Sequence, residues 1–186
     1  MFIIKNNYYL YIENTKNIDL NSIKVKKKIN IIYRNNKIQE SVENLYRFRK
    51  HCKARGFKLY ISNNMKLLKD CRADGLYLSS YNKKIHLNKN LNLIGSAHSF
   101  KEINEKIKQG CKTIFLSRLF KTSYKDGKGQ LGVVKFNLLV AKYKVMIVPL
   151  GGIKYSNLNK LNLTNKSGLA LLSEVKKKPA ITNRLF

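Results

Sequence analysis

The chain has 186 residues, 44% of them hydrophobic, and its 38 Lys and Arg against 10 Asp and Glu give a formal charge of +28. That length and apolar fraction suit one ordinary domain with a real core, so we expect a single domain over residues 1–186. The three cysteines lack CxxC spacing, which argues against a disulfide framework or a structural zinc site. No apolar run approaches the roughly 18 residues of a membrane span, and the N-terminus lacks a signal-peptide pattern, so we expect a cytoplasmic protein.

Short apolar runs rich in Ile, Leu, Val, Tyr and Phe recur along the chain. Several are apolar on both faces, which favours buried parallel strands over a half-exposed antiparallel sheet. In chain order the predicted strands are YYLYI (8–12), INIIY (29–33), KLYIS (58–62), GLYLS (75–79), NLIGSA (92–97), TIFLS (113–117), VMIVPL (145–150) and GLALLS (168–173).

Amphipathic stretches between these runs predict helices at 41–55, 99–109, 133–143 and 156–161. The second is the clearest, because Ser99 fits an N-cap, Glu102 follows three residues later as in a capping box, and Gly110 ends the pattern.

Alternating strands and helices predict an α/β fold with a parallel sheet and right-handed crossovers. Eight units favour a (β/α)8 TIM barrel. Since such barrels usually need about 200 residues, we expect shortened or missing helices, after the first, third and fourth strands. On pattern alone, an open doubly wound sheet remains an alternative.

The positive charge allows two interpretations. Clustered Lys and Arg bind nucleic acids, but here the basic residues are dispersed, with runs of three only at 26–28 and 176–178, and no nucleic-acid-binding motif appears. A field that attracts anionic small molecules is therefore favoured over binding to RNA or DNA.

In a barrel, chemistry belongs to the loops that follow the strands. Arg34 ends an apolar strand, where a guanidinium facing the barrel mouth predicts binding of an anion. The segments KTSYKDGKG (121–129) and PLGGI (149–153), with Ser173 after the eighth strand, predict a phosphate site. No pair of carboxylates or clustered histidines predicts acid–base or metal chemistry.

Five segments resemble the thiamine phosphate synthase/TenI family in order and spacing. They are GSAHS (95–99), LSRLFKTSYK (116–125), LG ahead of KF (131–136), PLGGI (149–153) and GLALLS (168–173), within a similarity from about Tyr8 to Val175. The resemblance implies a (β/α)8 barrel. It also implies a transferase that couples hydroxymethylpyrimidine diphosphate to thiazole phosphate, releasing pyrophosphate and forming thiamine phosphate.

The resemblance also implies roles for individual residues. Arg34, Ser96 and Lys125 fall on catalytic positions of the family. The substrate-binding positions are Asn63, Thr122, Tyr124, Gly152, Leu172 and Ser173.

Two positions depart from the family pattern. The family implies Mg²⁺, but its two metal-binding aspartates are Asn64 and Asn82 here, and an amide oxygen is a poorer ligand for a hard cation than a carboxylate. We therefore expect weak metal binding. The alternative function is a non-catalytic or TenI-like barrel that binds thiazole phosphate or thiamine phosphate. The expected partners are phosphorylated small molecules, and pairing of two barrels as a homodimer stays open.

Overall fold

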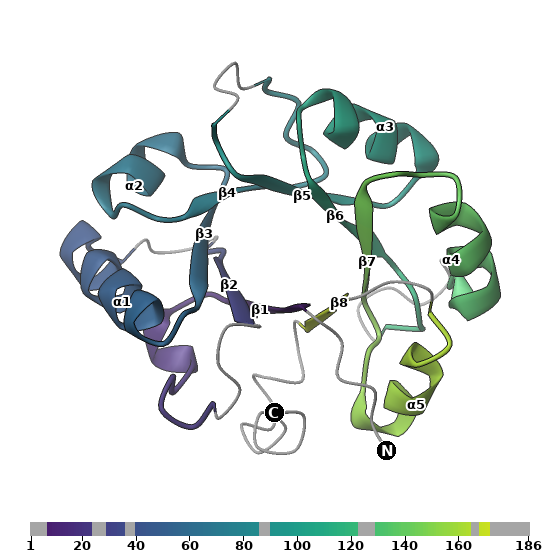
Figure 1. Ribbon diagram of the computed structural model, residues 1–186, viewed down its shortest axis with the longest axis horizontal. Coiled ribbons are helices and arrows are strands. Elements are labelled where there is room, and N and C mark those ends of the chain that lie inside the picture. The colour runs from purple at the N-terminus through teal and green to yellow at the C-terminus, as the bar shows by residue number, and fades with distance from the viewer. Residues whose placement is uncertain are drawn as a thin grey trace.

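A computed structural model describes residues 7–23, 29–35, 40–85, 90–122, 129–164 and 168–171. Its eight strands pair in parallel in chain order, and the sheet closes because the eighth strand pairs with the first (Figure 1). The strands are β1 (Asn7–Ile12), β2 (Ile29–Tyr33), β3 (Lys58–Ser62), β4 (Gly75–Leu78), β5 (Leu93–Ala97), β6 (Thr113–Ser117), β7 (Met146–Leu150) and β8 (Gly168–Leu171). The predicted parallel α/β fold is confirmed, and the open sheet is excluded by the β1–β8 pairing.

The two contacts of β8 differ in extent. Four residue pairs join β8 to β1, from Asn7 with Gly168 to Leu10 with Leu171, whereas Leu150 with Ala170 is the one pair between β7 and β8 in the described part of the chain. The seam between β7 and β8 is therefore the weaker side of the barrel.

Within the described ranges, five α-helices and two 3-10 helices cover the outside of the sheet (Figure 1). They are η1 (Thr15–Asn17), α1 (Val42–Ala54), α2 (Met65–Asp70), α3 (Phe100–Lys108), α4 (Gly132–Val140), η2 (Tyr155–Asn157) and α5 (Leu158–Leu161). Among the described residues between β1 and β2, η1 is the only helix, and the described residues between β4 and β5 form no helix, as expected. After β3 the helix is shortened to six residues rather than lost.

The start of α3 follows the prediction with one difference. The Ser99 hydroxyl accepts a hydrogen bond from the Glu102 amide at 3.3 Å, so Ser99 is the N-cap. The Glu102 carboxylate accepts a hydrogen bond from the His98 amide at 2.8 Å. In a capping box it would accept from the amide of the N-cap residue itself, Ser99.

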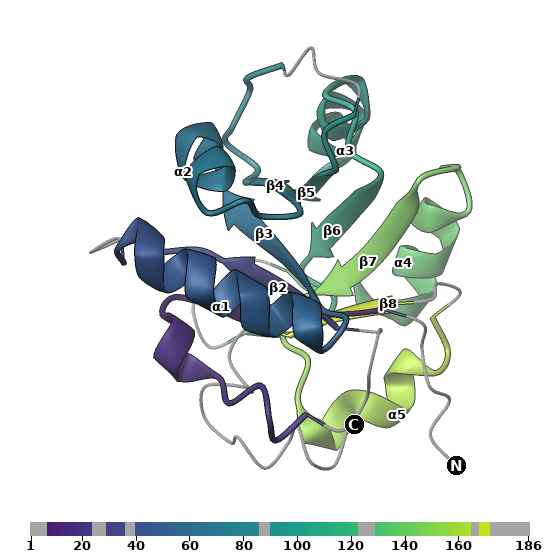
Figure 2. The same ribbon diagram turned by 60° about the vertical axis from the view of Figure 1, so that its left-hand side comes forward.

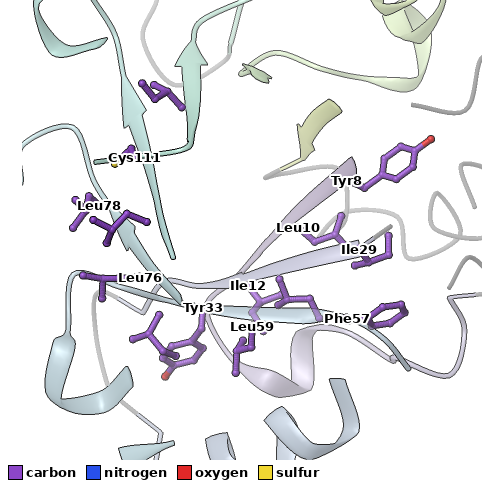
Figure 3. Packing of buried hydrophobic residues seen from close by; sticks show 14 of the residues in the cluster. Tyr8, Leu10, Ile12, Ile29, Tyr33, Phe57, Leu59, Leu76, Leu78 and Cys111 are labelled. Carbon is purple, nitrogen blue, oxygen red and sulfur yellow. The ribbon is translucent and has the colours of Figure 1, made fainter. Parts of the chain in front are cut away.

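Alternation along each strand separates two cores. Outward side chains such as Ile12, Tyr33 and Leu59 pack beneath the helices, and Figure 3 shows part of this layer around β1, β2 and β3. Inward side chains fill the barrel itself. They are Tyr9, Tyr11, Ile32, Tyr60, Tyr77, Ile94, Phe115, Val148 and Ala170.

Aromatic rings make up most of the volume inside the barrel. The Phe115 ring meets Tyr9 edge-on at 4.8 Å and Tyr11 at 6.0 Å between centroids, and Tyr11 meets Tyr77 at 5.5 Å. Edge-to-face contacts of this kind are favourable beyond the area that they bury. The interior is thus a packed floor beneath the mouth rather than a pore.

One polar latch ties α1 to the sheet, and Figure 2 shows α1 lying alongside it. Asp74, in the turn before β4, accepts a hydrogen bond from the Leu59 amide of β3 at 2.8 Å and forms an ion pair with Arg49 of α1 at 2.5 Å. Both side chains of the ion pair are largely shielded from water.

No helix within the described ranges is long and apolar enough to cross a membrane.

We expect Asp74→Ala to lower the free energy of unfolding by about 3 kcal/mol, because it leaves the shielded Arg49 guanidinium unpaired and removes the acceptor of the Leu59 amide. Urea denaturation would measure this loss. Glu43→Ala is the matched control, since it breaks the exposed ion pair of α1 with Arg47 and should change stability by less than about 0.5 kcal/mol. Equal effects of the two variants would show that the latch is no stronger than a surface pair.

Candidate active site

The carboxyl ends of the strands meet at one end of the barrel and form its mouth. Residues two apart on a strand share a face, so Arg34 and Ser96 continue the inward rows that begin at Ile32 and Ile94. Tyr11 lies one residue before the end of β1 in the same way. The strand alternation therefore directs a guanidinium and several hydroxyl groups toward the mouth.

Arg34 directly follows β2 and is held there by its backbone. Its amide donates to the carbonyl of Ile12 at 2.8 Å, which extends the β1–β2 pairing by one residue. The Nε atom of its guanidinium is buried and has no hydrogen-bond partner. A buried donor without a partner costs free energy, and an anion in the mouth would satisfy it.

Ser96 lies on β5 and is buried. Its hydroxyl accepts a hydrogen bond from the Tyr77 hydroxyl of β4 at 2.9 Å. Both groups are shielded from bulk water, since Tyr77 is 1% and Ser96 5% exposed. The Tyr77 hydroxyl thus fixes the orientation of the serine that the resemblance placed near the reacting groups.

Tyr11 lies between these two features. Its ring packs edge-on against Tyr77, while its buried hydroxyl has no hydrogen-bond partner. Burial raises the pKa of Tyr11 well above its ordinary value, the neighbouring Tyr77 hydroxyl adds to that rise, and the Arg34 charge opposes it. Tyr11 therefore stays neutral and keeps its proton. Contacts thus run from the Tyr11 ring through Tyr77 to Ser96, and Arg34 follows the strand beside Tyr11.

Asn63 links the ends of β3 and β4 and uses its whole side-chain amide to do so. Its Oδ1 accepts from the Ser79 amide at 3.0 Å and from Asn82 Nδ2 at 2.9 Å. Its Nδ2 donates to the hydroxyls of Ser79 at 2.8 Å and Tyr81 at 3.2 Å. The backbone is left-handed at φ 55°, a conformation that asparagine adopts more readily than most residues. In this structure, Asn63 is a clamp, and its predicted contact with substrate stays a prediction.

The two positions that correspond to metal-binding aspartates do not fit Mg²⁺. The Asn64 side chain caps α2 by accepting from the Leu67 amide at 2.9 Å. Asn82 donates to Asn63 and accepts from the Lys84 amide at 2.9 Å. No group of three His, Cys, Asp or Glu gathers in the described part of the chain, and Mg²⁺ prefers anionic oxygen ligands. Both amides therefore serve local structure.

A buried lysine lies behind this amide network. Lys106 of α3 is 0% exposed, and its ammonium group donates to the Asn82 carbonyl at 2.7 Å and to Gln109 Oε1 at 2.9 Å. Burial lowers its pKa, because desolvation disfavours the charged form. Gly95 makes room for the stem, since a Cβ there would lie 2.9 Å from Lys106 Cδ. These contacts hold the non-helical segment around Asn82 that follows β4.

The predicted phosphate side is described only in part. Gly151 and Gly152 follow β7 with φ of 92° and 70°, and a Cβ on Gly152 would lie 2.4 Å from the Phe120 carbonyl. Two glycines are thus needed for the chain to turn against the loop after β6. Thr122 is half-buried in that loop. The predicted residues Tyr124, Lys125, Leu172 and Ser173 lie outside the described residues.

Sequence reasoning points to Arg34 and Ser96 but gives no role to Tyr11, Tyr77 or Lys106. It predicts Tyr11 and Tyr77 only as members of strands, although their inward register near strand ends follows from the same alternation. Lys106 gave no usable signal, because a lysine in an amphipathic helix is normally placed toward water. His98, which directly follows β5, is exposed.

We expect Asn63→Ala to lower the free energy of unfolding by about 3 kcal/mol, because it removes four hydrogen bonds and puts alanine in a left-handed conformation. Asn64→Ala is the neighbouring control and should cost about 1 kcal/mol, the usual value of a lost N-cap. Urea denaturation of both variants would measure the difference. A loss at Asn63 no larger than that at Asn64 would contradict the clamp.

Known proteins resemble this chain in sequence and in fold. The model of a family described as thiamine monophosphate synthase matches residues 12–175. The thiamine-phosphate synthase of Prochlorococcus marinus subsp. pastoris is 27% identical over 141 residues, which are 73% of this chain and 39% of that protein. This chain therefore spans about two fifths of the length of the curated relatives that it matches.

Solved structures agree in fold. A thiamine phosphate pyrophosphorylase from Pyrococcus furiosus superposes with a TM-score of 0.71 at 16% identity, covering 98% of both chains. The thiamine phosphate pyrophosphorylase from Bacteroides thetaiotaomicron gives 0.66 at 14% identity, covering 97% of this chain and 93% of that one. At such identities the likeness shows the fold alone.

Proposed function

Because the chain belongs to the thiamine monophosphate synthase family, we propose that its single barrel forms thiamine phosphate at the mouth. The thiazole nitrogen attacks the methylene carbon of hydroxymethylpyrimidine diphosphate, and the bond from that carbon to the diphosphate oxygen breaks. Pyrophosphate leaves with the bonding electron pair. The observation that carries the proposal is the unpartnered, buried Nε of Arg34 at the mouth.

Arg34 supplies positive charge where the leaving group gains negative charge. A guanidinium donates several hydrogen bonds in one plane and remains charged at every working pH, which suits the oxygens of a diphosphate. Burial of Nε strengthens such a contact, because water competes less for the donor. We assign to Arg34 the binding of the diphosphate and the stabilisation of released pyrophosphate.

Ser96 orients the other reactant. With the Tyr77 proton directed at its oxygen, Ser96 is left to donate its own proton toward the mouth. A hydrogen bond there would hold the pyrimidine with its methylene carbon facing the thiazole nitrogen. Alignment of two bound reactants lowers the barrier by reducing the entropy lost on reaction.

The thiazole phosphate is placed at the opposite side of the mouth, beside β6 and β7. Thr122 and Gly152 line this side, with Tyr124, Lys125, Leu172 and Ser173 proposed as its further residues. Lys125 would add charge that helps to neutralise the departing pyrophosphate. The positive surface of the whole chain supports the choice of two anionic reactants.

A second function is favoured by one observation. The Asn64 and Asn82 amides are engaged in a cap and in the Asn63 network, so these two positions do not offer the anionic oxygens that a metal-dependent pyrophosphate departure needs. The barrel could then bind thiazole phosphate or thiamine phosphate without turnover. That function requires the phosphate side but not the charge of Arg34.

The first experiment measures thiamine phosphate formation from the two phosphorylated precursors with magnesium, read as fluorescence after oxidation. We expect turnover by the wild type and at least a hundredfold loss in Arg34→Met, since the neutral side chain cannot stabilise pyrophosphate. Arg47→Met, on the exposed face of α1, should retain wild-type rates. Full activity of Arg34→Met would contradict its assigned role.

Absence of turnover in the folded wild type would favour the binding function. In that case thiazole phosphate should still raise the thermal midpoint of unfolding, and Ser173→Glu should remove this rise by repelling the phosphate. Failure of thiazole phosphate and thiamine phosphate alike to raise the midpoint would contradict both functions.

A further inference from the structure

We propose that Tyr11 is a further ligand-binding residue of the mouth, whose hydroxyl donates a hydrogen bond to an oxygen of the diphosphate group that Arg34 binds. This inference rests on the proposed function for the identity of its ligand. It concerns a residue that the sequence motifs did not single out.

The first argument is the state of the hydroxyl. Tyr11 is 3% exposed, and its oxygen is buried without a hydrogen-bond partner. The hydroxyl of the neighbouring Tyr77 donates to Ser96, and although it acts on the Tyr11 hydroxyl, no hydrogen bond of normal geometry joins the two. Buried polar groups are nearly always paired, so an unpaired one at a mouth suggests that the missing partner is a ligand.

The second argument is position. Tyr11 is one residue from the end of β1, and Arg34 extends β2 beside it by donating its amide to the Ile12 carbonyl. Tyr11 pairs with Ile32 in the β1–β2 register, and Arg34 lies two residues further along the same inward row. Both Arg34 Nε and the Tyr11 hydroxyl are therefore unsatisfied donors on the adjacent strands β1 and β2, a pair suited to two oxygens of one anion.

The third argument is rigidity. The Tyr11 ring is fixed edge-on between Tyr77 at 5.5 Å and Phe115 at 6.0 Å, so the hydroxyl cannot turn away to water. Because burial raises its pKa, the group keeps its proton and donates at any pH at which the protein is studied. A preorganised neutral donor loses little entropy when the anion arrives.

The test compares Tyr11→Phe with Tyr9→Phe. Tyr9 lies two residues earlier on the same inward row, and its ring also packs on Phe115, but its hydroxyl is at the far end of the barrel beside Thr113. Isothermal titration with inorganic pyrophosphate would give the dissociation constant of each variant. Urea denaturation without ligand would give their stability.

For Tyr11→Phe we expect at least tenfold weaker pyrophosphate binding together with unchanged or higher stability, since the lost hydroxyl had no partner in the free protein. For Tyr9→Phe we expect wild-type binding. A merely structural role of Tyr11 would give the opposite pair of results, namely lower stability with unchanged affinity. That outcome would overturn the inference.

Arg34→Met, measured in the same titration, separates this inference from the function beneath it. One outcome is that the wild type binds pyrophosphate, Arg34→Met loses this binding and Tyr11→Phe retains it. In that case Tyr11 is not a ligand-binding residue, and the role of Arg34 stands. If the folded wild type does not bind pyrophosphate, both the site and the Tyr11 inference are overturned.

Discussion

The mouth of this barrel depends on how its interior is filled. Inward rows from eight strands converge on the axis, and aromatic side chains from β1, β3, β4 and β6 occupy most of that space. Edge-to-face contacts fix each ring against the next. A rigid floor of this kind fixes the hydroxyls of Tyr11 and Tyr77 beneath the mouth, on the same inward rows that lead to Arg34 and Ser96 at the proposed site. The packing of the barrel interior therefore determines the positions of the residues at the mouth.

The amide network at the ends of β3 and β4 is the second determinant of the mouth. Asn63 and Asn82 bond to each other, Asn63 also bonds to two hydroxyls and a backbone amide, and Asn64 caps the helix beside them. The buried ammonium of Lys106 holds this network through the Asn82 carbonyl. Amides can pair with each other without repulsion, whereas carboxylates at the same distances would repel unless a cation lay between them. The asparagines thus allow these loops to be held together without a metal ion.

Charge enters this protein at two scales. The formal charge of +28 gives the whole surface a long-range attraction for anions, which salt screens. Arg34 acts at short range. Because its Nε atom is buried, water competes little for the hydrogen bond that this atom can donate. Only the second scale selects a ligand, because direction and distance matter there. The two together fit phosphorylated substrates and explain why a basic composition need not indicate nucleic acid.

The sequence by itself determined the order and nearly the bounds of all eight strands, since runs such as INIIY and TIFLS carry their β-propensity and burial locally. It also determined the cap at Ser99, and it pointed to Arg34 directly after a strand and to Ser96 near the end of one. The tertiary structure alone decided that Asn82 bonds to Asn63 and that Lys106 is buried behind them. Both contacts join residues distant along the chain, and the residue type does not reveal which partner it will meet. The same reason hid Tyr11, because a missing hydrogen bond becomes visible only when every neighbour is in place.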